Sequence, residues 1–527
     1  MATHLHLPLR MRTTIGALLA AGLFAGSATA AQENKVWITL GDAAYAQLQK
    51  VAPTAIAKES RISQGSQAGA KFAGGEGIHL VEVDEAQMLS LSAAIHHELR
   101  RCGGFMYHAS ESAGKQALGK PSAASLAALS RPAYVIDNQA LVTPMLAQMQ
   151  DSNIAQTIVD LSAFTNRYYT TNGGVNASNW LKQKWSTMAA GRSDISVTQF
   201  THPSYPQKSV ILTINGSDNA AEVLVLGAHL DSINGNGTSE GTRAPGADDD
   251  ASGVASMTEA LRVMLASGYQ PRRTIKMIAY AAEEVGLRGS QEIALSFKSN
   301  QVNVVGVMQL DMTNYKGSPN DIYMYTDYTD SQQNAFVVKL INTYLPNLTI
   351  GYDKCGYGCS DHASWSAQGY AASMPFETAF TQDNPYIHTA NDTYANSGNQ
   401  ALHALKFARM AAAYAVELGS DGPGVAPPAD REETASGSLT AGQKKTYGPY
   451  KVAAGGGFKA ALTGSGDTDL YVRKDALPTT TTFDCKSDGP SSAENCAIQL
   501  TANGDVYVLL NGYSASAYTL TVNYRPQ

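Results

Sequence analysis

The chain lacks an apolar run long enough to cross a membrane as a helix, for which about 20 residues are needed. The run near the N-terminus, from Ile15 to Phe24, is much shorter, and no later run reaches that length. The chain also lacks a basic run, and its 38 Lys and Arg residues stand against 45 Asp and Glu residues. Nucleic acids and anionic membranes attract clustered positive charge. We therefore expect neither of them as a partner.

Cysteine is scarce, with five residues in 527. Four of them form two close pairs in the sequence, and Cys102 stands alone. Such pairs are typical of disulfides in an exported protein, or of the thiolates of a structural zinc site. A four-sulfur zinc site would need both pairs close together, although they fall in what look like separate domains. Disulfides are therefore favoured for the paired residues, which are Cys355, Cys359, Cys485 and Cys496.

Residues 1–30 have the features of an export signal. Arg10 and Arg12 precede the apolar run, and Ala28-Thr29-Ala30 has small residues at the positions that a signal peptidase reads. We expect cleavage near Ala30, which would make the mature chain a secreted, extracellular protein.

The rest of the chain is too long for one core and divides by composition. Residues 31–135 mix short strand-like segments with a helical run, Glu85 to Arg101, and end in a low-complexity stretch before Arg131-Pro132. We interpret 31–135 as an α+β propeptide that acts in cis as a folding chaperone or an inhibitor; a retained N-terminal domain is the alternative. Residues 421–431 have linker composition. Residues 432–527 alternate short strand-like runs with Gly and Asn turns, as a β-sandwich does.

Residues 136–420 alternate apolar runs of strand length with helical stretches. Apolar residues recur at three- and four-residue spacing from Ser252 to Ala266, with Asp250 or Ser252 available as the N-cap. Buried strands alternating with helices predict a mixed, mostly parallel sheet with helices on both faces. The expected strands are Val210–Ile214, Glu222–Leu226, Thr274–Ala281, Val304–Leu310 and Ala371–Phe376.

Acidic residues and histidines stand where several of these strands end. Ligands of an open α/β sheet bind beyond the carboxyl ends of its strands. Each such residue alone is typical of a solvated turn or a helix cap, but their coincidence at one rim favours a metal site. His229, Glu283, Glu284 and Asp311 follow strands, while Asp248 to Asp250 stand on the loop that leads into the next helix and His388 stands on a later loop.

Histidine and carboxylate ligands without cysteine suit Zn²⁺ or a similar divalent ion in an open, catalytic site. Consecutive residues of an extended chain point to opposite sides. One residue of the Glu283-Glu284 pair can therefore bind a metal while the other stays free as a base. Asp231 follows His229 by two residues, where its carboxylate can hold the second imidazole N–H.

Six segments contain these residues and their neighbours, namely 227–232, 245–253, 279–290, 309–312, 355–364 and 384–389. Together they resemble the bacterial leucyl aminopeptidases that have a co-catalytic dizinc centre. The similarity runs from about residue 160 to residue 420 with the spacings intact. The tail, 432–527, is similar to the bacterial pre-peptidase C-terminal domain.

The resemblance implies a secreted aminopeptidase of the zinc exopeptidase type. It would remove the N-terminal residue, leucine or another apolar one, from peptides with a free N-terminus. Glu283 would be the general base that takes a proton from the attacking water. Two Zn²⁺ ions are implied, with Asp249 as the bridge, His229 and Asp311 at one ion, and Glu284 and His388 at the other.

The resemblance also implies a disulfide between Cys355 and Cys359 beside the substrate pocket, and the pair Cys485 and Cys496 in the tail. The chain departs from the expected family pattern at Tyr325 and Asp383, which stand in place of an aliphatic residue and a tyrosine. The residue preference is therefore left open. The expected pocket residues are Met312, Tyr357, Ser360, Met374, Phe376, Phe380 and Ile387. Ordinary core packing is the alternative for five of them, Met312, Met374, Phe376, Phe380 and Ile387.

Two other classes of function are compatible with parts of this pattern. A carboxypeptidase, a deacylase or a glutaminyl cyclase could use the same scaffold, but the long match in spacing argues against them. A binding or adhesion protein stabilised by metal would need no spare base, so Glu283 argues against that class. We expect a monomer.

Overall fold

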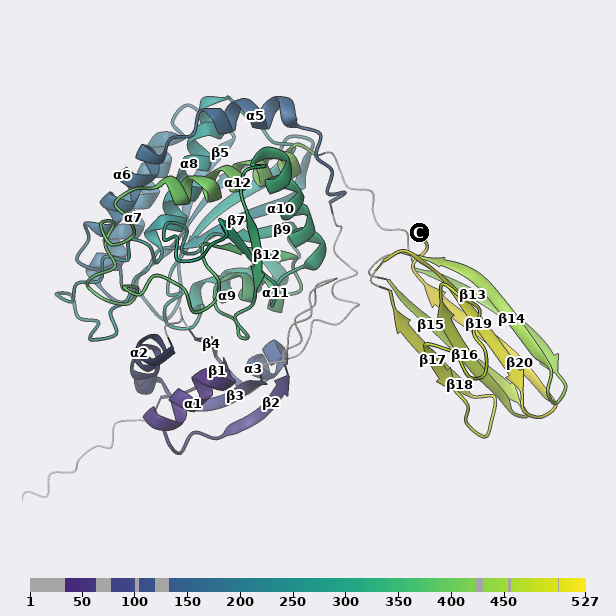
Figure 1. The fold of residues 1–527 in the computed structure, drawn as a ribbon. Helices are drawn as coiled ribbons and strands as arrows, with labels where there is room; N and C mark the ends of the chain where they lie inside the picture. Colours follow the sequence, from purple (N-terminus) through teal and green to yellow (C-terminus); the bar gives the residue numbers. More distant parts are fainter. Residues whose placement is uncertain are drawn as a thin grey trace, which may run out of the picture.

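The computed structural model describes residues 34–62, 77–99, 104–118, 132–421, 430–453, 456–500 and 502–527. The expected signal peptide, Cys102 and most of the expected linker lie outside the described residues. The described residues form an N-terminal unit, a large central unit and a C-terminal unit (Figure 1). None of the described helices is both long and apolar enough to cross a membrane.

The N-terminal unit is an antiparallel sheet with helices, so the α+β architecture expected for this region is confirmed. Its strand order is β2-β3-β1-β4, and apolar residues of the sheet, α1 and α2 share one core. Its elements are β1 (Lys35–Gly41), α1 (Asp42–Val51), β2 (Ala57–Ile62), β3 (Gly77–Asp84), the 3₁₀ helix η1 (Glu85–Gln87), α2 (Met88–Leu99), β4 (Phe105–His108) and α3 (Glu111–Leu118).

The central unit is built on an eight-stranded mixed sheet of order β11-β10-β12-β9-β7-β8-β6-β5. Four pairs in it are parallel, β10 with β11, β12 with β9, and β7 with both β8 and β9, while three pairs are antiparallel. The five expected strands are present with shifts of at most three residues. The strands are β5 (Ile195–Phe200), β6 (Ser209–Ile214), β7 (Asn219–His229), β8 (Arg273–Tyr280), β9 (Asn303–Gln309), β10 (Ile322–Tyr325), β11 (Ile350–Asp353) and β12 (Ala372–Phe376).

Helices cover both faces of this sheet, as predicted (Figure 1). The larger core lies under α5 to α8, α10 and α12, and the smaller one under α9 and α11. Strands buried on both faces explain why their sequences are continuous apolar runs. The helices are α5 (Gln139–Ala147), α6 (Asp151–Ser162), α7 (Asn172–Met188), α8 (Ala251–Ala266), α9 (Arg288–Ser299), α10 (Ser331–Tyr344), α11 (His362–Ala367) and α12 (Leu402–Ser420).

The C-terminal unit consists of two four-stranded antiparallel sheets, β13-β20-β15-β18 and β14-β19-β16-β17. Alternate residues from both sheets meet in one core, which is the arrangement of a β-sandwich. Cys485 and Cys496 form a disulfide here. The strands are β13 (Arg431–Leu439), β14 (Lys444–Val452), β15 (Gly457–Ser465), β16 (Thr468–Lys474), β17 (Cys485–Ser487), β18 (Glu494–Gln499), β19 (Gly504–Gly512) and β20 (Ser516–Tyr524).

Candidate metal centre

Three neighbouring strands bring histidine and acidic side chains to one edge of the central sheet. β7 ends at His229, and it lies between β8 and β9, which run parallel to it. Glu283 and Glu284 follow the end of β8, and Asp311 follows the end of β9. The carboxyl ends of parallel strands meet at the same edge, so residues far apart in the sequence become neighbours there.

Asp249 lies between two histidines. One of its oxygens, Oδ1, is 2.8 Å from His229 Nε2, and the other, Oδ2, is 3.1 Å from His388 Nε2. Asp311 Oδ1 is 3.6 Å from His229 Nε2, and Glu284 Oε2 is 2.8 Å from His388 Nε2. The five residues expected to bind metal thus lie together, with Asp249 in the position of a bridging carboxylate.

The donor atoms of this cluster are buried, and many have no hydrogen-bond partner. This holds for both oxygens of Glu283, for Glu284 Oε1, for Asp311 Oδ1 and for His388 Nδ1, whereas Glu284 Oε2 and His388 Nε2 form an ion pair. Buried charges without partners are costly, and a cation can offset the cost. Ligand atoms of His229, Asp249 and Glu284 lie within 4.8 Å of one another. Imidazole and carboxylate donors in this arrangement fit a divalent ion such as Zn²⁺.

Burial and the density of acidic groups disturb the pKa values in this cluster. Burial raises the pKa of Glu284 to about 7, reinforced by the Asp249 charge. Burial also raises the pKa of Glu283 well above its usual value, against the opposing charge of His229. Burial acts to lower the pKa of His388, but the Glu284 and Asp249 carboxylates outweigh it and raise that pKa to about 10. The cluster therefore favours positive charge, which bound metal ions would supply.

Asp250 also comes close to His229 and Asp311, but its oxygens are used by the backbone. Oδ2 accepts a hydrogen bond from the N–H of His229, and Oδ1 accepts from those of Gly253 and Met312. The bond from Gly253 is the expected N-cap of α8. Gly253 is needed here because a Cβ would lie 2.2 Å from the carbonyl oxygen of Leu310. Asp250 thus fixes the start of α8 against the ends of β7 and β9.

Asp231 has a wider role than the sequence suggested. Its carboxylate lies 3.6 Å from His229 Nδ1, while the nearer oxygen, at 3.2 Å, is the backbone carbonyl of Asp231 itself. The carboxylate accepts hydrogen bonds from the backbone N–H groups of Glu283, at 3.0 Å, and Glu284, at 3.2 Å. Asp231 therefore orients the acidic pair as well as the imidazole.

Two supporting residues were missed by the sequence analysis. Asp392 accepts hydrogen bonds from the backbone N–H groups of Asp248 and Asp249, each at 3.1 Å. Arg167 is fully buried and donates to the carbonyl oxygens of Leu230, Pro245 and Gly246. Asp392 is an acidic residue only four positions after the expected ligand His388, and this proximity in the sequence could have identified it as a supporting residue. Arg167 offered none, because its partners lie far along the chain.

The expected pocket residues gather beside the metal centre. Met312 and Ile387 pack in one cluster with the pocket walls, and Ser360 Oγ donates to Asp311 Oδ2 at 2.5 Å. The expected disulfide between Cys355 and Cys359 is formed. The cavity is lined by Tyr325, Cys355, Tyr357, Cys359, Met374, Phe376, Phe380 and Asp383.

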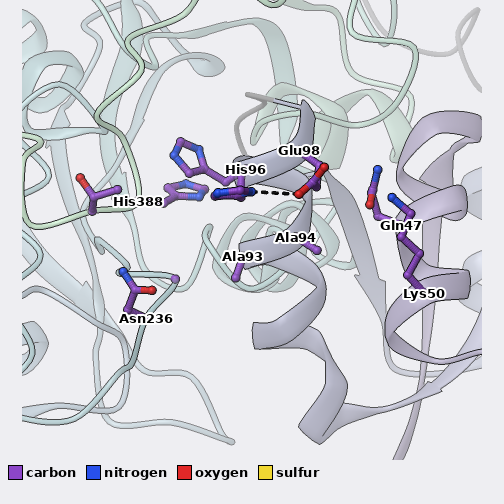
Figure 2. A pocket seen from close by; sticks show the side chains of 11 residues that line it. Gln47, Lys50, Ala93, Ala94, His96, Glu98, Asn236 and His388 are labelled. Atoms are coloured by element: carbon purple, nitrogen blue, oxygen red, sulfur yellow. Dashed lines mark hydrogen bonds and ion pairs between the residues drawn. The ribbon is translucent and has the colours of Figure 1, made fainter.

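The N-terminal unit lies against this edge of the sheet. The imidazole of His96, on α2, lies beside that of His388, with 5.0 Å between the ring centres (Figure 2). Nδ1 of His96 is buried without a hydrogen-bond partner. Arg288 donates to Glu85 Oε1 at 2.6 Å, and its guanidinium lies 4.1 Å from the centre of the Tyr107 ring. The two units are therefore joined next to the candidate metal ligands.

Comparison with known proteins agrees with this geometry. The model of peptidase family M28 matches residues 209–414. Leucine aminopeptidase 1 of Pyrenophora teres f. teres is 38% identical over 309 residues, covering 56% of this chain and 77% of that protein. A probable leucine aminopeptidase of Arthroderma otae is 35% identical over 291 residues, covering 53% of this chain and 76% of that protein. The crystal structure of the Legionella pneumophila LapA aminopeptidase is 31% identical, with a TM-score of 0.61, and covers 74% of this chain and 100% of that one.

The fold, the cluster and these similarities define a class of protein, and the chain belongs to peptidase family M28. It is a metallo-aminopeptidase, a hydrolase of a zinc-dependent family.

Proposed function

We propose that the chain removes the N-terminal residue of peptides with the help of two Zn²⁺ ions. His229 and Asp311 would hold one ion, Glu284 and His388 the other, and Asp249 both. The observation that carries this proposal is the position of Asp249, whose two oxygens each lie about one hydrogen-bond length from a different histidine, 2.8 and 3.1 Å.

The reaction needs a base beside the ions. When bound, such ions lower the pKa of water and polarise the scissile carbonyl. Glu283 accepts a proton from the attacking water and delivers it to the leaving amine. Its backbone N–H donates to Asp231, which fixes the residue at the end of β8, and its carboxylate makes no hydrogen bond that would compete for the proton.

The first side chain of the peptide enters the cavity beside Asp311 and His388. Met374, Phe376 and Phe380 give it an apolar wall, which suits leucine and other apolar residues. Met312 and Ile387 connect this wall to the metal ligands, because each is adjacent in sequence to one of them. The free α-amine lies at the metal centre, so only the first peptide bond is cleaved.

Residues 31–135 act in cis as an inhibitor or a folding chaperone that is removed from the mature enzyme. Inhibition is supported by the place of His96, which lies beside His388 where a substrate would approach (Figure 2). Ala93, on the same helix, also comes close to Gly235, at the rim of the site.

The remaining parts complete an exported protein. Residues 1–30 are a signal peptide, 136–420 the catalytic domain of a secreted monomer, 421–431 a linker, and 432–527 a pre-peptidase C-terminal domain. Both disulfides, Cys355 with Cys359 and Cys485 with Cys496, are compatible with an extracellular location.

The proposal is tested by substrate and metal dependence together. The purified chain, before and after limited proteolysis near Arg131, is incubated with leucine amide and with N-acetyl-leucine amide. We expect turnover of the free-amine substrate alone, loss of turnover with a chelator, and recovery with two equivalents of Zn²⁺. Turnover of the acetylated substrate, or turnover that persists after complete chelation, would contradict the proposal.

A further inference from the structure

His388 is the proposed metal ligand that lies farthest along the chain from any helix or strand. Residues 377–401, all of which the structure describes, form a loop between β12 and α12 without a helix or strand of its own. His388 also has a φ of 56°, in the left-handed region that costs energy for residues other than glycine. Contacts with other segments must therefore hold its imidazole beside Asp249.

The carboxylate of Asp248 connects this loop to the segment of the bridging ligand. Asp248 directly precedes Asp249 and is fully buried. Its Oδ2 accepts a hydrogen bond from Asn384 Nδ2 at 2.9 Å. Asn384 Oδ1 in turn accepts the N–H of Tyr386 at 3.1 Å, which fixes the orientation of the amide. Because Asn384 precedes His388 by four positions, this bond ties the chain just before His388 to the residue beside the bridge.

The other oxygen of the same carboxylate binds the segment of Asp311. Asp248 Oδ1 accepts the backbone N–H of Asn314 at 3.1 Å, and Asn314 follows Asp311 by three positions. One side chain thus joins three segments that are far apart in the sequence and that contain Asp249, Asp311 and His388.

The backbone around Asp248 binds the same loop on the other side of His388. The N–H groups of Asp248 and Asp249 donate to the two carboxylate oxygens of Asp392, each at 3.1 Å. The N–H of Ala247 donates to the carbonyl oxygen of Asp392, also at 3.1 Å. The loop is therefore fixed four positions before His388 by a side chain and four positions after it by backbone donors.

The contacts of Asp248 do not serve to cap α8. The N-cap of that helix is Asp250, whose side chain accepts the N–H of Gly253. The two donors to the Asp248 carboxylate, from Asn314 and Asn384, both lie outside α8. The three consecutive aspartates thus have separate tasks, because Asp249 faces both histidines, Asp250 caps α8 and Asp248 connects the segments.

We propose that Asp248 is a positioning residue of the metal centre, which holds His388 where it can share a zinc ion with Asp249 and Glu284. This role rests on the proposed dizinc function. Residues that orient metal ligands typically contribute about 10- to 100-fold to metal affinity. The effect falls mainly on the ion at Glu284 and His388, because no helix or strand supports the loop of His388.

The test breaks and then restores the bond between Asp248 and Asn384. Asp248→Asn turns one oxygen into an NH₂ group, so the side chain can accept only one of its two donors. Asn384→Ala removes the donor from the loop and leaves the charge of the site unchanged. In the double variant, Asp248→Asn with Asn384→Asp, donor and acceptor are exchanged and the total charge is restored, so the hydrogen bond can form in the opposite direction.

The measurement is the affinity of the metal-free full chain for Zn²⁺, determined by calorimetric titration, so that it does not depend on hydrolysis. We expect the unchanged protein to bind two ions. Asp248→Asn and Asn384→Ala should each bind one of them about 10- to 100-fold more weakly. The double variant should recover affinity relative to Asp248→Asn. Circular dichroism checks that each variant is folded, and if Asp248→Asn is not, Asn384→Ala decides the question.

The matched control is Asp327→Asn, because Asp327 is also a buried carboxylate whose two oxygens each accept a backbone N–H, those of Cys355 and Gly356. This control should bind both ions with unchanged affinity. Unchanged zinc affinity in the folded single variants, no recovery in the double variant, or an equal loss in the control overturns the inference about Asp248. An unchanged protein that binds fewer than two zinc ions would instead contradict the proposed dizinc function.

Discussion

Asp231 offers a direct test of how the acidic pair is held in place. In the Asp231→Asn variant, one carboxylate oxygen becomes an NH₂ group that cannot accept the N–H of Glu283 or of Glu284, now bonded at 3.0 and 3.2 Å. One hydrogen bond to a charged group is lost, worth about 1.5–3 kcal/mol, and a buried N–H is left without an acceptor. We therefore expect the free energy of unfolding to fall by about 3 kcal/mol.

The same substitution should reduce activity, because the base and one metal ligand lose their common support. Residues that orient metal ligands typically contribute about 10- to 100-fold to activity or metal affinity. The matched control is Asp330→Asn, since Asp330 also accepts two backbone N–H groups, those of Gln332 and Gln333, at the start of α10.

The assays for this pair of variants are urea unfolding of the metal-free proteins and hydrolysis of leucyl p-nitroanilide. The control should lose little stability and no activity, because asparagine caps a helix as well as aspartate does and both N–H groups bond to the single oxygen Oδ1 that asparagine retains. If Asp231→Asn is as stable and as active as the unchanged protein, Asp231 does not orient Glu283 and Glu284. If both variants lose activity equally, the effect is one of general stability.

Three further predictions concern the base and the flanking units. Glu283→Ala should keep the fold and the bound zinc, measured by circular dichroism and elemental analysis, while hydrolysis falls by at least about 10²- to 10⁴-fold; substantial remaining activity would show that another group is the base. With the N-terminal unit still attached, the His96→Ala variant should be more active than the unsubstituted chain, whereas His97→Ala, which changes an exposed neighbouring side chain, should not be. Equal effects of the two substitutions would argue against a covering role for His96. Removal of 432–527 should leave kcat/KM for leucine amide unchanged, because this unit has its own core, and a folded but inactive truncation would contradict that expectation.

The sequence predicted the central fold and the proposed ligands because their signals are local. Each buried strand is a continuous apolar run, and residues such as His229 and Asp311 stand directly after such runs. Parallel strands end at one edge, so the order of the strands alone brings these residues together. The residue-by-residue pairing of Asp249 with His229 and His388 came from the family resemblance, and the distances agree with it.

The supporting contacts could not be predicted because they join segments that only the fold brings together. Arg167 reaches the carbonyl oxygens of Leu230 and Pro245, which are 63 and 78 positions away, and Asp392 accepts N–H groups from Asp248 and Asp249, which are 144 and 143 positions away. Backbone acceptors and donors have no sequence signature. The contact between His96 and His388 is also between units, so neither helix pattern nor composition indicated it.

The number and the positions of the metal ions test the account most directly. Crystals of the zinc-loaded protein, measured at the zinc absorption edge, should show two anomalous peaks. One peak should lie between Asp249 and His229, near Asp311, and the other between Asp249 and His388, near Glu284. A single peak, or two peaks of which neither contacts Asp249, would contradict a dizinc centre bridged by this residue.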